Sequence, residues 1–189
     1  TRAESEAEMH RLWAVMQATS DGYCGADRSM SGFAGGDAAK VNAAAARGVL
    51  YADGYFADVM AEALKTAECN ACMKRIVAAP TAGSCGVLPA VLLPLARAGQ
   101  ADEDAVCDAL YVAAGFGQVI AARATLAGAE GGCQAEVGAA SAMAAAALGA
   151  RVIVKHFSLD RTWGGPDASF SMTPDEFAHI VEGVRQVEA

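Results

Sequence analysis

The 189-residue sequence predicts an all-α fold, with a minor β contribution at residues 151–155. Apolar residues recur at helical spacing through most of the chain. Hydrophobic residues make up 54% of the sequence and aromatic residues only 6%, so the apolar content is mainly small aliphatic side chains. Because small side chains let helices approach closely, this composition favours a compact helical domain, which we expect over residues 1–149.

Two amphipathic helices, separated by a glycine-rich loop, are expected in the first part of the chain. The first helix carries an apolar stripe at the spacing i, i+3, i+4 and i+7, formed by Met9, Leu12, Trp13 and Met16. Residues 20–37 break this pattern with serine, glycine and aspartate, which predicts a loop. The second helix is predicted from Phe56 to Asn70.

A short extended run and a buried helix are expected next. Residues 75–79 are apolar and lead into Pro80, whose ring disfavours a helical conformation in the residue before it. After a polar turn, the apolar residues 87–95 predict a buried helix, which Pro94 is expected to kink or end.

The following helices are rich in alanine and glycine. One or two helices are expected over residues 103–126, broken around Gly115 and Gly117. Another is expected over residues 134–148, where alanine is so frequent that hydrophobic periodicity does not identify the buried face.

Residues 150–189 form a divergent tail. Its β-branched run, Val152–Val154, predicts a strand in a chain that otherwise shows little β signal. Thr173–Glu176 is typical of a capping box, with Pro174 at the first helical position. The apolar stripe of the helix that follows is formed by Phe177, Ile180, Val181 and Val184. We expect this stripe to pack over the alanine-rich helix of the same domain.

Charge and hydropathy argue against two classes of protein. The formal net charge of −8 argues against nucleic-acid binding, because no basic stripe is present to neutralise phosphates. Polar residues, glycine and alanine interrupt every apolar run before it reaches membrane length, so no membrane span is expected. No signal segment is recognised at the start, so we expect a cytoplasmic protein. Residue 1 is Thr1 rather than methionine, which suggests a start inside a longer reading frame.

The cysteines favour free thiols over disulfides, because a cytosolic chain of this size does not need such cross-links. The six cysteines are Cys24, Cys69, Cys72, Cys85, Cys107 and Cys133. Cys69 and Cys72 form a CxxC pair, which can signal a redox pair or half of a zinc site. No second CxxC and no histidine pair completes a zinc set, so we interpret this pair as structural.

Cys133 lies between a glycine pair and the first turn of the alanine-rich helix. Backbone N–H groups and the positive end of the helix dipole favour a thiolate there, which could be a metal ligand or a nucleophile. The alternative is a small buried hydrophobe, because cysteine is among the most buried residue types.

The turn Pro80–Gly86 places two hydroxyls, a thiol and two glycines before the buried helix. Such a helix start can bind a carboxylate or phosphate, or it can be an ordinary helix cap. The spacing and ending of a phosphate-binding P-loop are absent. The glycine-rich loop Ser31–Asp37 could bring backbone close to a ligand, which by itself is a weak signal.

The order of three blocks along the chain is more specific than any one of them. SGFAGGDAAK, NACMKRIVAAPTAGSCGVLPAVL and GAEGGCQAEVGAASAMAAAAL together resemble the catalytic alpha portion of iron–sulfur-dependent L-serine dehydratases (L-serine ammonia-lyases) over residues 1–149. The resemblance implies a largely helical cytosolic enzyme that converts L-serine to pyruvate and ammonia. It also implies a [4Fe–4S] cluster, held by three cysteine thiolates, whose free iron acts as a Lewis acid on the substrate hydroxyl.

The resemblance assigns roles to a few residues of this chain. Cys133 corresponds to the first cluster cysteine. Recognition of the carboxylate and ammonium groups of L-serine is expected at two loops, at Ser31, Gly32, Thr81, Ala82, Gly83 and Ser84. The residue that removes the α-proton is not identified. A beta subunit or a second copy of the chain is the expected protein partner.

The sequence also departs from the family. Two further cluster cysteines of the family lie downstream of the GGCQ helix, whereas no cysteine follows Cys133 here. We therefore expect a family domain cut short after the GGCQ helix and followed by a tail that does not align with it. The alternatives to a serine dehydratase are a non-catalytic helical fragment and a module that binds a small carboxylate or a partner. A rearranged cluster site using Cys24, Cys69, Cys72 or Cys85 and a CxxC redox or zinc protein are further alternatives.

Overall fold

The computed structural model describes residues 1–50, 54–150, 157–165, 168, 171–178 and 181–182, without the side chains of Cys133 and Gln134. Its six α-helices are α1 (Arg2–Asp21), α2 (Asp37–Ala46), α3 (Gly54–Ala71), α4 (Val87–Arg97), α5 (Glu103–Arg123) and α6 (Gly128–Ala147). Two 3₁₀ turns, η1 (Ala82–Ser84) and η2 (Arg161–Trp163), complete the elements of the described residues. The prediction of an all-α fold is confirmed.

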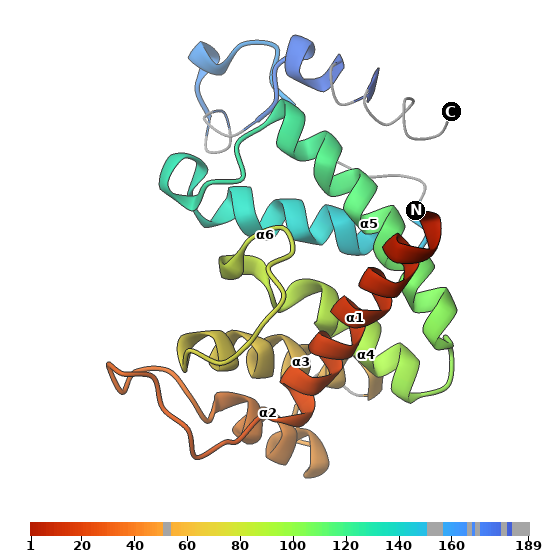
Figure 1. Ribbon diagram of the computed structural model, residues 1–189. Coiled ribbons are helices and arrows are strands. Elements are labelled where there is room, and N and C mark those ends of the chain that lie inside the picture. Colours follow the sequence, from red (N-terminus) through yellow and green to blue (C-terminus); the bar gives the residue numbers. More distant parts are fainter. Residues whose placement is uncertain (51–53, 151–156, 166–167, 169–170, 179–180, 183–189) are drawn as a thin grey trace.

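The helices form a bundle around α4. Figure 1 shows α1 lying across the front, with α2 and α3 at one end of the bundle and α5 and α6 at the other. Helix α4 packs against α3 and α6, α5 packs against α6, and α2 packs against α3. The core is formed by Trp13, Met16, Leu88, Leu92, Leu93, Val106, Cys107, Leu110, Ala113, Met143 and Ala144.

Helix α1 follows the sequence prediction closely. Thr1 and Glu4 form a capping box, in which each residue's side chain binds the other's backbone N–H group. Trp13 and Met16, from the predicted apolar stripe, are fully buried, at 1% and 3% exposure. Burial of this stripe against the core attaches the helix to the bundle.

Helix α5 corrects the expectation of a break around Gly115 and Gly117, because it runs unbroken from Glu103 to Arg123. The structure gives Gly117 a packing role instead. A β-carbon added there would lie 2.9 Å from the sulfur of Met143 on α6. Gly117 therefore allows α5 and α6 to approach closely.

The structure differs from the sequence-based expectations at two further helices. Of the two effects expected of Pro94, ending the helix is wrong, because α4 continues to Arg97, and a kink stays a prediction. A proline inside a helix removes one backbone hydrogen bond, and the burial of α4 in the core offsets this cost. Helix α2 lies at the end of the predicted loop and was not predicted.

Helix α6 begins earlier than expected, at Gly128, and is interrupted at Gly132. The backbone of Gly132 has φ 67° and ψ −176°, so two helical segments meet there at a kink. A positive φ is easily adopted by glycine and not by other residues. Cys133 consequently begins the second helical segment, as the sequence predicts for its backbone.

The described part of residues 157–182 lies beyond the C-terminal end of α5 (Figure 1). The predicted strand at 151–155 falls outside the described residues. Half of the predicted capping box is present, because the Thr173 backbone N–H group donates to Glu176 at 2.9 Å. Phe177 contacts the ring of Phe157 edge to face, at 6.0 Å between ring centroids. Packing of this last helix over α6 stays a prediction.

Among the described residues, α5 is the one helix long and apolar enough to cross a membrane by length and composition alone. Buried core helices of other proteins pass the same test. In this structure α5 packs against α1 and α6 and buries Val106 and Leu110.

Candidate functional site

The predicted turn Thr81–Ser84 follows a cis peptide bond between Ala79 and Pro80 and forms η1. The hydroxyl groups of Thr81 and Ser84 lie 3.2 Å apart. Ser84 is buried, Thr81 is half-buried, and Ala82 and Gly83 are exposed. The turn thus presents two adjacent hydroxyls beside an exposed stretch of backbone.

Glu136 on α6 is the residue that this turn meets. The Thr81 hydroxyl donates a hydrogen bond to Glu136 Oε1 at 2.7 Å, across 55 positions of sequence. The contact joins η1 to α6, which pack against each other. Two of the sequence blocks that are far apart in the chain therefore meet at one carboxylate.

Two glycines leave room for this carboxylate. A β-carbon added at Gly83 would lie 2.7 Å from Glu136 Oε2 and 2.8 Å from Oε1. A β-carbon added at Gly128 would lie 2.7 Å from Oε2. Any side chain at either position would displace the carboxylate, so the absence of side chains at both positions defines where it sits.

Cys133 lies three residues before Glu136 on α6. Residues three apart on a helix share a face, so the backbone of Cys133 lies one turn from the carboxylate. The structure does not describe the side chain of Cys133, and the role of this residue as a metal ligand stays a prediction.

The second predicted loop is built differently. Ser31 and Gly32 are exposed in the loop between α1 and α2, which projects from the bundle beside α2 (Figure 1). Ser31 contacts Ser29 through their hydroxyls at 3.1 Å, and the Gly32 N–H group donates to the Ser29 carbonyl at 2.8 Å. No hydrogen bond among the described residues joins Ser31 or Gly32 to the turn at Thr81.

The glycines of this loop serve helix α2. The backbone N–H groups of Gly36, Asp37 and Ala38 donate to the Glu68 carboxylate at 2.9, 2.6 and 3.2 Å. Gly36 has a φ of 87°, a left-handed conformation that favours glycine. A carboxylate from α3 thereby occupies the start of α2, where a ligand anion would otherwise bind.

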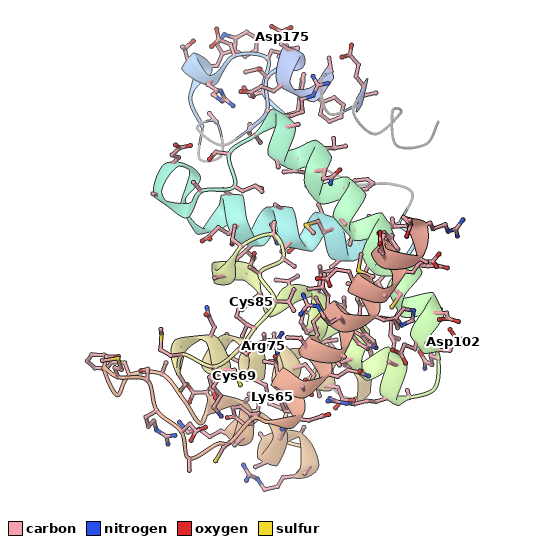
Figure 2. The ribbon with its side chains drawn as sticks, in the orientation of Figure 1. Lys65, Cys69, Arg75, Cys85, Asp102 and Asp175 are labelled. Atoms are coloured by element: carbon pink, nitrogen blue, oxygen red, sulfur yellow. The ribbon has the colours of Figure 1, made fainter. Side chains whose placement is uncertain are left out.

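Three of the described cysteines are buried thiols. Burial raises the pKa of the thiols of Cys69, Cys85 and Cys107, so these side chains are neutral near pH 7. Figure 2 labels Cys69 and Cys85, which come from α3 and from the residue after η1. Cys69 donates to the Thr19 carbonyl at 3.6 Å, as expected for a structural thiol. Among the described residues, no three His, Cys, Asp or Glu side chains are placed to hold a metal ion.

A hollow of about 630 Å³ lies between α1 and α5, away from these motifs. Its lining includes Ser5, His10, Asp104 and Tyr111 and no residue of the three blocks. The Ser5 and Tyr111 hydroxyls lie 2.7 Å apart across it.

Glu136 is the site residue that sequence reasoning missed. Its signal was its position within GGCQAEVG, three residues after the cysteine and on the same helix face. What singles it out is contact with Thr81 and Gly83, which are distant in sequence.

The sequence matches two families in different parts. Residues 1–152 match the family described as serine dehydratase alpha chain, and residues 129–189 match the NeuB family. The two matches overlap over residues 129–152. The tail that does not align with the first family is therefore similar to the second.

Curated relatives reflect the same division. The L-serine dehydratase alpha chain of Peptoniphilus asaccharolyticus is 53% identical over 94 residues, which cover 50% of this chain and 32% of the relative. The probable L-serine dehydratase alpha chain of Bacillus subtilis is 38% identical over 148 residues, which cover 78% of this chain and 49% of the relative. The N-acetylneuraminate-9-phosphate synthase of Homo sapiens is 51% identical over 53 residues, which cover 28% of this chain and 15% of the relative.

The chain thus spans about a third to a half of the length of these serine dehydratase relatives. No solved structure gives a significant match.

Proposed function

The chain belongs to the serine dehydratase alpha-chain family, and from this membership we propose that residues 1–152 carry part of an L-serine ammonia-lyase active site. The substrate is L-serine and the products are pyruvate and ammonia. Loss of the α-proton and of the hydroxyl group gives an aminoacrylate, which water hydrolyses to these products. Three relatives are named L-serine dehydratase alpha chains or probable ones, which supports this activity.

The hydrogen bond between Thr81 and Glu136 is the observation that carries the proposal. It joins a turn and a helix that belong to the two longest sequence blocks of the family resemblance. The buried Ser84 hydroxyl lies beside Thr81, so donors and acceptors for a small polar substrate converge at one end of α6. In this proposal the turn Thr81–Ser84 binds L-serine, and Ser31 and Gly32 contribute from the other loop.

The [4Fe–4S] cluster that the family resemblance implies does not fit the described residues of this chain by themselves. A cluster of this kind needs several cysteine ligands close together, and no three His, Cys, Asp or Glu side chains of the described residues are placed to hold a metal ion. Cys133 is the one cluster ligand we assign. In this proposal further thiolates come from a second subunit, as the name alpha chain in several relatives suggests, or from a second copy. We place the protein in the cytoplasm, as for an enzyme of amino-acid breakdown.

Binding of L-serine to the purified chain tests the proposed function. We expect saturable binding in a calorimetric titration, and about tenfold weaker binding for Thr81→Val, because this change removes a hydrogen bond near a charged ligand. The matched control is Thr162→Val, at an exposed threonine in the tail, which should bind L-serine like the wild type. Wild-type protein that does not bind L-serine, or a Thr81→Val variant that binds it equally well, would contradict the proposal.

A further inference from the structure

Glu136 differs from Glu62 and Glu68, the buried carboxylates of the described residues, in having almost no partners. Its Oε1 accepts one hydrogen bond, from Thr81 at 2.7 Å. No donor to its Oε2 and no lysine or arginine partner is found among the described residues. Resting on the proposed L-serine site, we propose that Glu136 recognises the α-ammonium group of the substrate.

The position of the carboxylate suits this role. Gly83 and Gly128 crowd it so closely that a β-carbon at either one would lie 2.7 Å from Oε2. The Thr81 hydroxyl holds the other oxygen. One oxygen is therefore fixed while the second keeps its capacity to accept hydrogen bonds, and Gly83 beside it is exposed.

Charge makes the recognition specific. A half-buried carboxylate without a cationic partner gains from a bound ammonium ion, because charge-assisted hydrogen bonds are shorter and about twice as strong as neutral ones. A hydroxyl group in the place of the ammonium brings no charge. The site should therefore select an α-amino acid over the matching α-hydroxy acid.

The Ser84 hydroxyl lies 3.2 Å from the Thr81 hydroxyl, which is bonded to Glu136. The Thr81 hydroxyl has one proton, which it donates to Glu136, so the neutral Ser84 hydroxyl is the group that can donate to the substrate carboxylate. An ammonium group at Glu136 and a carboxylate near the hydroxyls would orient a zwitterion in one direction across the contact between η1 and α6.

Competing ligands and one isosteric variant test the inference. L-Glycerate has the configuration of L-serine and a hydroxyl in the place of the ammonium group. We expect wild-type protein to bind L-serine at least about tenfold more tightly than L-glycerate in calorimetric titrations. Glu136→Gln should remove this preference, because the amide still accepts the Thr81 hydrogen bond but carries no charge.

Two further variants control for structure. Glu130→Gln changes an exposed carboxylate in the first turn of the same helix and should keep the preference. Glu136→Asp keeps the charge with a shorter side chain, so it should retain the preference for L-serine with weaker overall binding. Far-UV circular dichroism of every variant should match that of the wild type.

The outcomes separate the inference from the proposed function. A Glu136→Gln variant that still prefers L-serine, or a Glu136→Asp variant that loses the preference completely, would overturn the role of Glu136 and leave the L-serine site intact. Equal binding of both ligands by the wild type would do the same. Wild-type protein that binds neither ligand would overturn the L-serine site and the role of Glu136 together.

Discussion

Helices α3 and α6 each direct glutamate side chains toward neighbouring elements, and they treat these side chains in opposite ways. Glu62 and Glu68 on α3 are buried, at 3% and 6% exposure, and each has several partners. Glu136 on α6 is half-buried and has one. Glu62 and Glu68 therefore stabilise the fold, whereas Glu136 keeps the capacity to bind a ligand.

Glu62 is neutralised by cations. Its Oε1 accepts from Lys65 at 2.6 Å and from Arg97 at 2.7 Å, and its Oε2 accepts from Ser20 at 2.5 Å. Burial by itself raises the pKa of Glu62, but the hydrogen bonds from Lys65 and Ser20, together with the positive charges of Lys65 and Arg97, leave this pKa below its ordinary value. The network ties α1, α3 and α4 together.

Glu68 is held by hydrogen bonds from backbone N–H groups and from one phenol. Three N–H groups at the start of α2 donate to it, and so does the hydroxyl of Tyr23 at 2.6 Å. Burial and this hydrogen bond raise the pKa of Tyr23 to about 12. A buried carboxylate with this many donors stabilises the fold and has little capacity left for a ligand.

Removal of the Glu62 carboxylate should have the largest effect on stability. Glu62→Ala should lower the free energy of unfolding by about 3 kcal/mol, because it leaves Lys65 and Arg97 without their buried partner. Urea unfolding followed by circular dichroism measures this change. Asp58→Ala, at an exposed carboxylate of the same helix that has no ion pair among the described residues, is the control and should unfold like the wild type. A small effect at Glu62 would show that the network contributes little stability.

The next effect concerns the start of α2. Glu68→Ala should lower the free energy of unfolding by about 2 kcal/mol, because it removes the acceptor for three backbone N–H groups and for Tyr23. Hydrogen exchange of the α2 amides should accelerate in this variant. Asp37→Ala, at the exposed first residue of α2, should change the free energy of unfolding and the exchange of the α2 amides much less. Unchanged exchange in Glu68→Ala would mean that α2 does not depend on this cap.

The smallest expected effect is on how the stability of the protein changes with pH. The folded-state pKa of Glu62 is lower than its ordinary value of 4.5, so the folded protein binds fewer protons here than the unfolded chain. This stabilisation is fully present above pH 4.5 and is lost as the pH falls through the folded-state pKa. As the pH is lowered from about 6 to about 3, the free energy of unfolding should therefore fall less steeply for Glu62→Gln than for the wild type. Equal slopes would contradict this assignment.

Much of the helical framework could be predicted from local pattern. The stripe of α1 and the length of α3 followed from apolar spacing alone. Gly115 and Gly117 predicted a break in α5 because glycine lowers helix propensity, but burial against Met143 on α6 favours the close approach that Gly117 permits. Helix α2 escaped prediction because its cap is not a neighbouring side chain but Glu68 from another helix.

The sequence by itself determined the helical class, the family and the two motifs that surround Thr81 and Cys133, because these properties depend on residue type and short spacing. The tertiary structure alone decided which carboxylate meets the turn at Thr81 and which carboxylates have their oxygens bonded by other protein groups. Those outcomes depend on contacts such as the bond from Thr81 to Glu136, between residues 55 positions apart. Contacts at that separation follow from how helices pack, which local spacing does not encode.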